Sequence, residues 1–284
     1  MDRFSKLNPK AAFLFFILII AASLILFHPA FLAVSFLSAF CYKVKLEGKT
    51  AFSYLFKFIL PMTVLIGVFN MFFARYGETV MFSLGENNFT FESLFYGICQ
   101  GIMFSGVLMW FSCYSQVITS ERLFAVFGRF APNTALVFSM VLSFIPRFKK
   151  NLAEIRDARE LINDGTSKLK KELSNFSALI TMVFEESIET ANSMKSRGFS
   201  KGRTPYSKYS FSFKDAFIIA VCIICFVFLA VIRFIGKISF IFEPVIIMKS
   251  FSFAALAVYI FFAFLPLIID FTEDIRWFCL KQKI

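Results

Sequence analysis

The chain has 284 residues, of which 58% are hydrophobic and 44 are Phe, and its mean hydropathy is +0.72. Soluble globular proteins are about 45–50% apolar, so this composition predicts an integral membrane protein. The formal net charge of +11 would also suit a nucleic-acid-binding protein, but the apolar segments explain the placement of the basic residues better, so we exclude nucleic acid as a partner.

Six apolar segments predict membrane-spanning helices. In chain order they are Ala11–Phe27, Pro29–Tyr42, Phe58–Phe73, Ser93–Cys113, Ala216–Ile232 and Ser250–Ile269. The first two are short for a hydrocarbon core of about 30 Å and meet at His28, which we expect to be an interfacial histidine beside a helix-starting proline. The basic start of the chain is like that of a signal peptide, but no cleavage site with a polar domain behind it follows, so we expect a retained first span.

The placement of Lys and Arg predicts the orientation in the membrane. With six spans and both termini inside, the outer segments hold only Arg75, Arg233, Lys237 and Lys249. The remaining 26 of the 30 basic residues then lie on the cytoplasmic side, as the positive-inside rule requires. We therefore expect both termini in the cytoplasm.

The six apolar segments contain no Asp, Glu, Lys or Arg, and Asn70 and Gln100 are their most polar side chains. Carriers driven by ion gradients and proton relays place ionisable groups at this depth, because charge has to be handled along the path. The sequence therefore predicts that any energy for transport is supplied from outside the membrane.

Motifs for nucleotide binding, catalysis and metal binding are weak or missing. Gly198–Thr204 resembles a phosphate-binding loop, but its spacing differs from GxxxxGK[ST] and it follows a helix instead of a strand. No HExxH or GxSxG motif occurs, and a single His restricts acid–base chemistry, so we do not expect an enzyme. Cys222 and Cys225 have CxxC spacing within an apolar segment, where we expect buried thiols and no metal.

Two long amphipathic helices are predicted between the fourth and fifth apolar segments. The second runs from Lys168 to Arg197 and stops at Gly198. The first starts near Phe144, and the apolar stretch Thr134–Pro146 either dips into the membrane or forms its upper part. The residues expected to pack these two helices together are Phe148, Leu152, Ile155, Leu173, Phe176, Ile180, Val183 and Met194.

The elements together predict an all-α, polytopic membrane protein with about six transmembrane helices and two long cytoplasmic helices. Residues 1–115 hold the first four spans, residues 116–210 the two long helices, and residues 211–284 the last two spans. The polar segment between the third and fourth spans is expected to turn at Gly85–Asn88.

An arginine lies near the end of each long helix. A planar, permanently charged guanidinium at a helix end suits an acidic groove of a partner protein. The helix dipole favours an ordinary arginine at the same place, so from the residues alone both interpretations stay open. The two sites are Ala158-Arg159-Glu160 and Ser196-Arg197-Gly198.

At these residues the chain resembles the transmembrane T component of energy-coupling factor transporters, the group that includes the cobalt-transport permease subunit. That family carries a short Ala-Arg-Gly motif on each of two long cytoplasmic coupling helices. Here Glu160 replaces the glycine of the first motif and Ser196 the alanine of the second. The segments Gly198–Thr204 and Lys6–Lys10 are also similar to those of the family.

The resemblance implies a non-catalytic subunit of the bacterial cytoplasmic membrane. It implies docking on two cytoplasmic ATPases, identical or different, through Arg159 and Arg197. It also implies a small membrane-embedded S component that captures a vitamin or metal ion, with ATP and Mg²⁺ bound by the ATPases and no cofactor or metal bound by this chain. Two alternatives are a self-contained channel or carrier with a regulatory helix pair, and a membrane scaffold without a transport role.

Overall fold

The computed structural model describes residues 4, 7–73, 79–84, 87–127, 132–161, 167–199, 212–236, 238–241 and 247–281. The chain divides into two compact units. The membrane unit comprises Met1–Thr119 and Tyr209–Ile284, and the α-hairpin unit comprises Ser120–Lys208.

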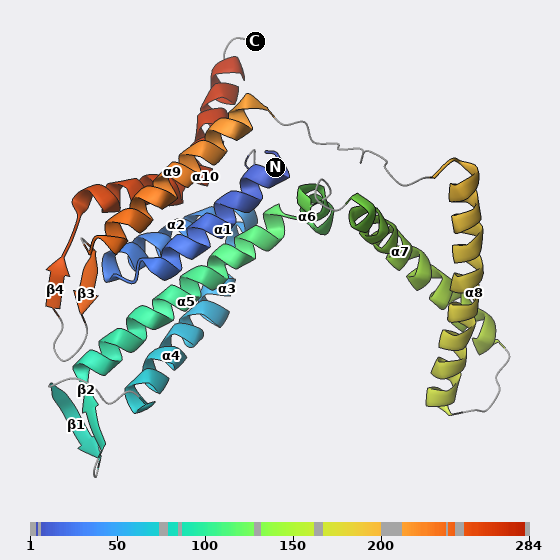
Figure 1. Ribbon diagram of the computed structural model, residues 1–284. Coiled ribbons are helices and arrows are strands. Elements are labelled where there is room, and N and C mark those ends of the chain that lie inside the picture. The colour runs from blue at the N-terminus through green and yellow to red at the C-terminus, as the bar shows by residue number, and fades with distance from the viewer. Residues whose placement is uncertain are drawn as a thin grey trace. The chain divides into compact units, whose positions relative to one another are not determined.

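Helices form the body of the membrane unit (Figure 1). They are α1 (Pro9–Ile25), α2 (Pro29–Glu47), α3 (Lys49–Tyr54), a π-helical turn η2 (Leu55–Ile59), α4 (Leu60–Phe73), α5 (Phe91–Val117), α9 (Phe213–Phe234) and α10 (Phe253–Lys281). Five helical stretches, with Lys49–Phe73 counted as one, are long and apolar enough to cross a membrane among the described residues. The remaining predicted span is α1, a shorter apolar helix of 17 residues. The predicted class of polytopic helical membrane protein is confirmed.

Several of these helices extend beyond the predicted apolar segments and take in charged residues. Lys43 lies in α2, Glu92 in α5, Asp215 in α9 and Asp270 in α10. All four side chains are buried. The helices therefore carry buried charge directly beyond the segments that sequence analysis had bounded as uncharged.

Among the described residues, two short antiparallel β-hairpins, which sequence analysis did not predict, lie between helices at one end of the membrane unit (Figure 1). The first pairs β1 (Val80–Leu84) with β2 (Asn87–Thr90), and the second pairs β3 (Ser239–Ile241) with β4 (Ile247–Ser250). The predicted turn at Gly85–Asn88 falls partly outside the described residues. Both β-hairpins lie opposite the end at which α1 begins.

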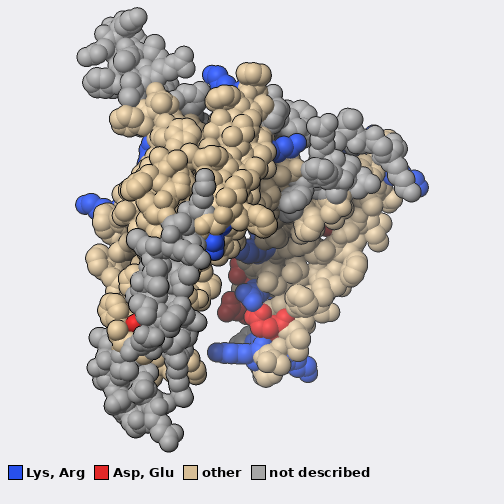
Figure 2. All heavy atoms as spheres, turned by 60° about the vertical axis from the view of Figure 1, so that its left-hand side comes forward, with Lys and Arg blue, Asp and Glu red and all other residues tan. Residues whose placement is uncertain are grey.

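The aromatic core of the membrane unit surrounds α1. Phe15 and Phe16 are fully buried, and both rings contact Trp110 of α5 at centroid distances of 5.9 and 6.3 Å. The indole Nε1 of Trp110 donates a hydrogen bond of 3.2 Å to Ser35 Oγ on α2, so the polar atom of this buried ring has a partner. Outside the core, uncharged residues make up most of the described surface in view in Figure 2.

Helices α4 and α5 approach closely through small residues. A Cβ atom added at Gly97 would lie 2.9 Å from Gly67 O, and one added at Gly101 would lie 2.8 Å from Thr63 O. The hydroxyl groups of Thr63 and Ser105 hydrogen-bond at 2.6 Å across the same contact. Small residues and hydroxyl groups hold helices together in membranes, where burial of apolar surface gives little preference for protein over lipid.

The α-hairpin unit consists of α6 (Ser120–Phe127), α7 (Pro132–Glu160) and α8 (Lys168–Ser196). The stretch Thr134–Pro146 belongs to α7, with Pro146 inside the helix, so it forms the upper part of the first long helix. Its entry into the membrane stays a prediction. The second predicted long helix is confirmed, with Arg197 as its C-cap and Gly198 just beyond at a φ of +77°. Such a left-handed residue commonly ends a helix.

Candidate docking site on the α-hairpin unit

Helices α7 and α8 pair in antiparallel orientation. Arg147 near the middle of α7 lies 3.9 Å from Glu186, in the C-terminal half of α8. Arg156, close to the end of α7, lies 2.6 Å from Glu172, close to the start of α8. Arg147, Arg156 and Glu172 are more than half exposed and Glu186 is partly exposed, so each pair contributes only about 0–1 kcal/mol. The pairs show the direction of the helices more than they stabilise them.

The centre of the α7–α8 contact is partly polar. Asn151 of α7 and Asn175 of α8 are 8% and 6% exposed, and Leu179 is 9% exposed. Asn151 Nδ2 and Asn175 Oδ1 are buried without a hydrogen-bond partner among the described residues. A buried polar atom without a partner costs about 1–3 kcal/mol, so this contact is not the tight apolar seam that the sequence pattern predicts.

The residues predicted to pack the two helices divide into two groups. Those that are partly buried are Phe148, Leu152, Ile155, Val183 and Met194. Leu173, Phe176 and Ile180 are instead 61%, 56% and 40% exposed. The α7–α8 contact runs along Asn175 and Leu179, and the three exposed side chains lie on a neighbouring face of α8. A helical period identifies an apolar face, but it does not say whether the partner of that face belongs to the same chain.

This exposed side of α8, which we call the α8 apolar face, extends over most of the helix. Its residues are Leu169, Leu173, Phe176, Ile180, Phe184 and Ile188, each at least 40% exposed. From first to last residue the face is roughly 28 Å long, at a rise of about 1.5 Å per residue. Contiguous exposed apolar surface is typical of sites that contact another protein or a membrane.

The two predicted docking arginines lie toward opposite ends of α8. Arg159, in the last turn of α7, donates a hydrogen bond from Nη1 to Ser174 Oγ near the start of α8. Arg197 caps the other end of α8. The distance along α8 from Ser174 to Arg197 is roughly 35 Å at a rise of about 1.5 Å per residue. Both arginines are exposed, as are the flanking residues Ala158, Glu160, Ser196 and Gly198.

The other candidate residues lie in the membrane unit. Cys222 is buried and Cys225 partly buried on α9, and both thiols are free. His28 is the N-cap of α2, where its Nδ1 accepts a hydrogen bond of 3.3 Å from the Ala30 N–H. Among the described residues, no three His, Cys, Asp or Glu side chains gather as ligands of a metal would.

Sequence reasoning did not single out Lys43, Asp215 or the asparagines of the α7–α8 contact. Lys43 and Asp215 stand at the ends of apolar segments, where charged residues are normally taken as solvated. Asn151 and Asn175 carry no distinctive spacing. Each asparagine is a polar residue on the face of its helix that contacts the other helix. That face is defined only by the packing of α7 on α8, so the sequence alone does not mark the asparagines.

No family model matches the chain. The chain is 28% identical over 244 residues to the energy-coupling factor transporter transmembrane protein EcfT of Brevibacillus brevis. The alignment covers 77% of this chain and 89% of that relative, and so spans both the membrane helices and the α-hairpin unit. With the helical membrane fold and the two long helices that carry an arginine in the last turn or at the C-cap, this similarity identifies the chain as a distant homologue of EcfT, the non-catalytic transmembrane component of energy-coupling factor transporters.

Proposed function

We propose that this energy-coupling component transmits force from two cytoplasmic ATPases, through the α-hairpin unit, to a membrane-embedded S component. The observation that carries the proposal is the exposed helix α8, with an arginine toward either end and an apolar face between them. The similarity to EcfT over most of the chain supports it. The cargo captured by the S component is a vitamin or a metal ion.

The arginines suit two separate docking contacts. Since Arg159 and Arg197 are roughly 35 Å apart along α8, one small acidic groove cannot take both. Two ATPase subunits, identical or different, offer one groove each. A guanidinium binds carboxylates through paired hydrogen bonds, so it gives each contact a defined direction. ATP and Mg²⁺ bind to the ATPases.

The α8 apolar face suits the S component. Phe176 and Phe184, exposed by 56% and 67%, provide large rigid apolar groups at its centre. Aromatic side chains dominate the energetics of many protein interfaces, because they bury much area with little loss of conformational freedom. A partner that lies in the membrane presents an apolar surface that matches this face.

The docking role is tested by the double substitution Arg159→Glu with Arg197→Glu. We expect the protein to reach the membrane in normal amount and co-purification of the ATPases to be lost, because both guanidinium contacts become repulsive next to acidic grooves. The matched control is Lys149→Glu with Lys150→Glu, which makes the same change of charge at exposed positions within α7. Undiminished co-purification with the arginine variant would refute the docking role.

The alternative function is a channel or carrier that works by itself, with the α-hairpin unit as a regulatory element. The purified chain, reconstituted alone in liposomes, separates the two. A coupling subunit by itself moves no solute, whereas a channel or carrier lets its solute flow down an imposed gradient.

A further inference from the structure

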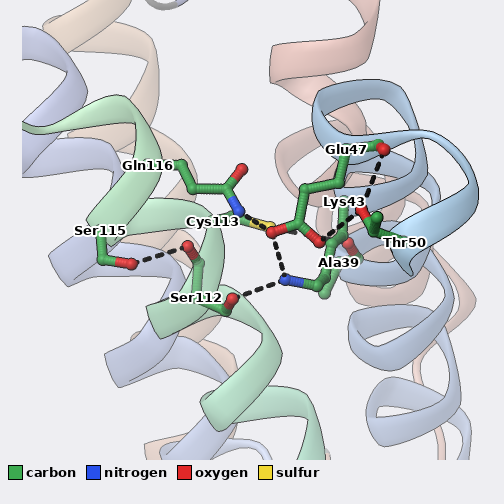
Figure 3. Close-up of polar contacts among 8 residues, drawn as sticks. All are labelled: Ala39, Lys43, Glu47, Thr50, Ser112, Cys113, Ser115 and Gln116. Carbon is green, nitrogen blue, oxygen red and sulfur yellow. Dashed lines mark hydrogen bonds and ion pairs between the residues drawn. The ribbon is translucent and has the colours of Figure 1, made fainter. Parts of the chain in front are cut away.

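Lys43 places an ammonium group inside the membrane unit, at the end of α2. Lys43 is only 1% exposed to solvent. Nζ donates hydrogen bonds of 2.6 Å to Ser112 Oγ and 3.1 Å to Glu47 Oε1, and lies 4.2 Å from the ring centroid of Tyr54. Figure 3 shows this Nζ between Glu47 and Ser112. Because the contacts come from α2, α3 and α5, one cation joins three helices.

The contacts on α5 lie in its last turns. Besides Ser112, Gln116 takes part, with Nε2 donating to Glu47 Oε1 (Figure 3). Helix α5 ends at Val117, and the membrane unit gives way to the α-hairpin unit after Thr119. The Lys43 cluster, made of Lys43, Glu47, Tyr54, Ser112 and Gln116, therefore holds the stretch of chain that leads into the α-hairpin unit.

The chain returns from the α-hairpin unit at a second buried charge. Asp215, 5% exposed, lies in the first turn of α9. Its Oδ2 accepts a hydrogen bond of 2.9 Å from the Ser212 N–H, and its Oδ1 one of 3.5 Å from the Asn8 N–H. Each of the two chain connections between the units thus meets the membrane unit beside a buried charged side chain.

A buried charge usually stabilises a helix bundle less than an apolar side chain of similar size does. Removing an ammonium group from water costs free energy that its partners repay only partly, and a well-packed apolar side chain often stabilises a fold as well or better. What a buried, hydrogen-bonded charge adds is a fixed geometry, because its partners must stay at defined distances and angles.

We infer that Lys43 is a positioning residue for energy coupling. It fixes the last turns of α5 to α2 and α3, so that a movement of the α-hairpin unit is passed on to the membrane helices instead of being absorbed by bending at the end of α5. This inference rests on the proposed function, in which the ATPases move the α-hairpin unit.

The test compares Lys43→Met with Lys45→Met. Lys45 lies on the same helix but pairs with Asp270 of α10, with 3.5 Å between Nζ and Oδ2, so the control removes a cation that joins α2 to a different helix. Ser112→Ala is a milder second variant, which removes the hydrogen bond between Lys43 and α5 and leaves Lys43 beside Glu47. All are made in full chains whose six cysteines have been replaced.

Two pairs of nitroxide labels on exposed positions give the readouts. Ser115 and Phe217 report on the end of α5 within the membrane unit, measured with the chain alone in nanodiscs. Thr181 and Phe217 report on the movement of α8, measured in the complex with the ATPases, before and after addition of ATP and vanadate. The rate of ATP hydrolysis is measured on the same complexes.

We expect the Ser115–Phe217 distance distribution of Lys43→Met to be about twofold broader than that of the parent, with a smaller broadening in Ser112→Ala and none in Lys45→Met. In the complex, Lys43→Met keeps its ATP hydrolysis but transmits less than half of the ATP-dependent change in the Thr181–Phe217 distance. A residue that served stability alone would lower hydrolysis and movement together.

Three results overturn the inference: a parent-like Ser115–Phe217 distribution in both Lys43→Met and Ser112→Ala, an equal broadening in Lys45→Met, or a full ATP-dependent movement in Lys43→Met. Should Lys43→Met fail to fold, Ser112→Ala decides by the same criteria. Failure of the proposed function looks different, since the parent would then bind no ATPases, while the Ser115–Phe217 comparison would still decide whether Lys43 fixes α5.

Discussion

At the scale of single residues, His28 shows how burial changes the pKa of a side chain. The side chain is 1% exposed, at the turn between α1 and α2, and its ring lies 5.8 Å from that of Phe31 and 5.3 Å from that of Phe251. Burial among these aromatic rings lowers the pKa of His28 below its usual 6.5, because the charged form loses its hydration. The neutral imidazole is also the form that can accept the hydrogen bond from the Ala30 N–H.

The lowered pKa predicts that the fold loses stability in acid. The unfolded chain binds a proton at His28 before the folded chain does, so stability from this residue is complete above the unfolded pKa of 6.5 and declines as the pH falls from there toward the lowered folded pKa. His28→Asn keeps an N-cap acceptor but does not titrate. Thermal unfolding is measured in detergent at about pH 7.5 and 5.5, and the fall in Tm between these pH values should be smaller in His28→Asn than in the parent. An equal acid effect in both proteins would contradict the prediction.

At the scale of helices, the α4–α5 contact depends on glycines that let two backbones approach. Gly101→Ala would place a Cβ 2.8 Å from Thr63 O, a backbone atom that cannot turn away. We expect a loss of about 1–3 kcal/mol, typical of overpacking. Gly106→Ala is the control on the same helix, since its Cβ would meet no atom closer than 3.9 Å. Unfolding of both variants in a denaturing detergent mixture measures the difference in stability. Equal stability of the two variants would mean that α4 and α5 move apart to admit the new Cβ without loss of stability.

Neighbouring residues of α8 predict opposite outcomes for a carboxylate. Leu179→Asp puts a charge into the α7–α8 contact, where Leu179 is 9% exposed, and should destabilise the α-hairpin unit by several kcal/mol. Phe176→Asp puts the charge on the α8 apolar face, where Phe176 is 56% exposed, so the fold should survive and binding of the S component should weaken. Protease resistance of α7 and α8 measures the destabilisation expected in Leu179→Asp. Co-purification of the S component measures the weaker binding expected in Phe176→Asp. Equal protease sensitivity of the two variants would refute this division of faces.

Helices and strands can be predicted from the sequence where the pattern that indicates them lies within the element itself. The helix Lys168–Ser196 was found from its apolar period and from Gly198, whose positive φ is a local requirement. The partner of its apolar face was not found, because Phe176 and Leu179 are equally apolar and only the position of α7 distinguishes them. Lys43 was missed for the same reason, since its burial depends on Ser112, far along the chain. The β-hairpins were missed because strands this short give little periodic signal.

At the scale of the whole membrane unit, the two ends of the helices differ in character. The β-hairpins lie at one end, and the starts of α1 and α9 lie at the other (Figure 1). Asp270, in the second half of α10, pairs with Lys45 in the last turn of α2, with 3.5 Å between Oδ2 and Nζ, and so belongs to the second end as well. The positive-inside rule assigns that second end to the cytoplasm, which remains a prediction for this chain.

Labelling across the membrane tests this orientation. Phe213 and Phe234 stand at opposite ends of α9 and are 88% and 95% exposed. In a chain without its native cysteines, Phe234→Cys should react with a membrane-impermeant maleimide on intact cells, and Phe213→Cys only after the cells are opened. The two variants control for each other, and the reverse pattern would invert the topology.

Burial of Lys43, Asp215 and Asp270 directly beyond uncharged segments also has a consequence for biogenesis. The insertion machinery meets apolar stretches without a charge, so each helix enters the bilayer without the penalty of an ionised group at its centre. We expect the three charges to stay in the hydrated headgroup layer until neighbouring helices bury them, as they do in the folded chain. We therefore expect insertion and tertiary assembly to be separate events, and a chain that inserts but fails to assemble to keep these three groups in contact with water.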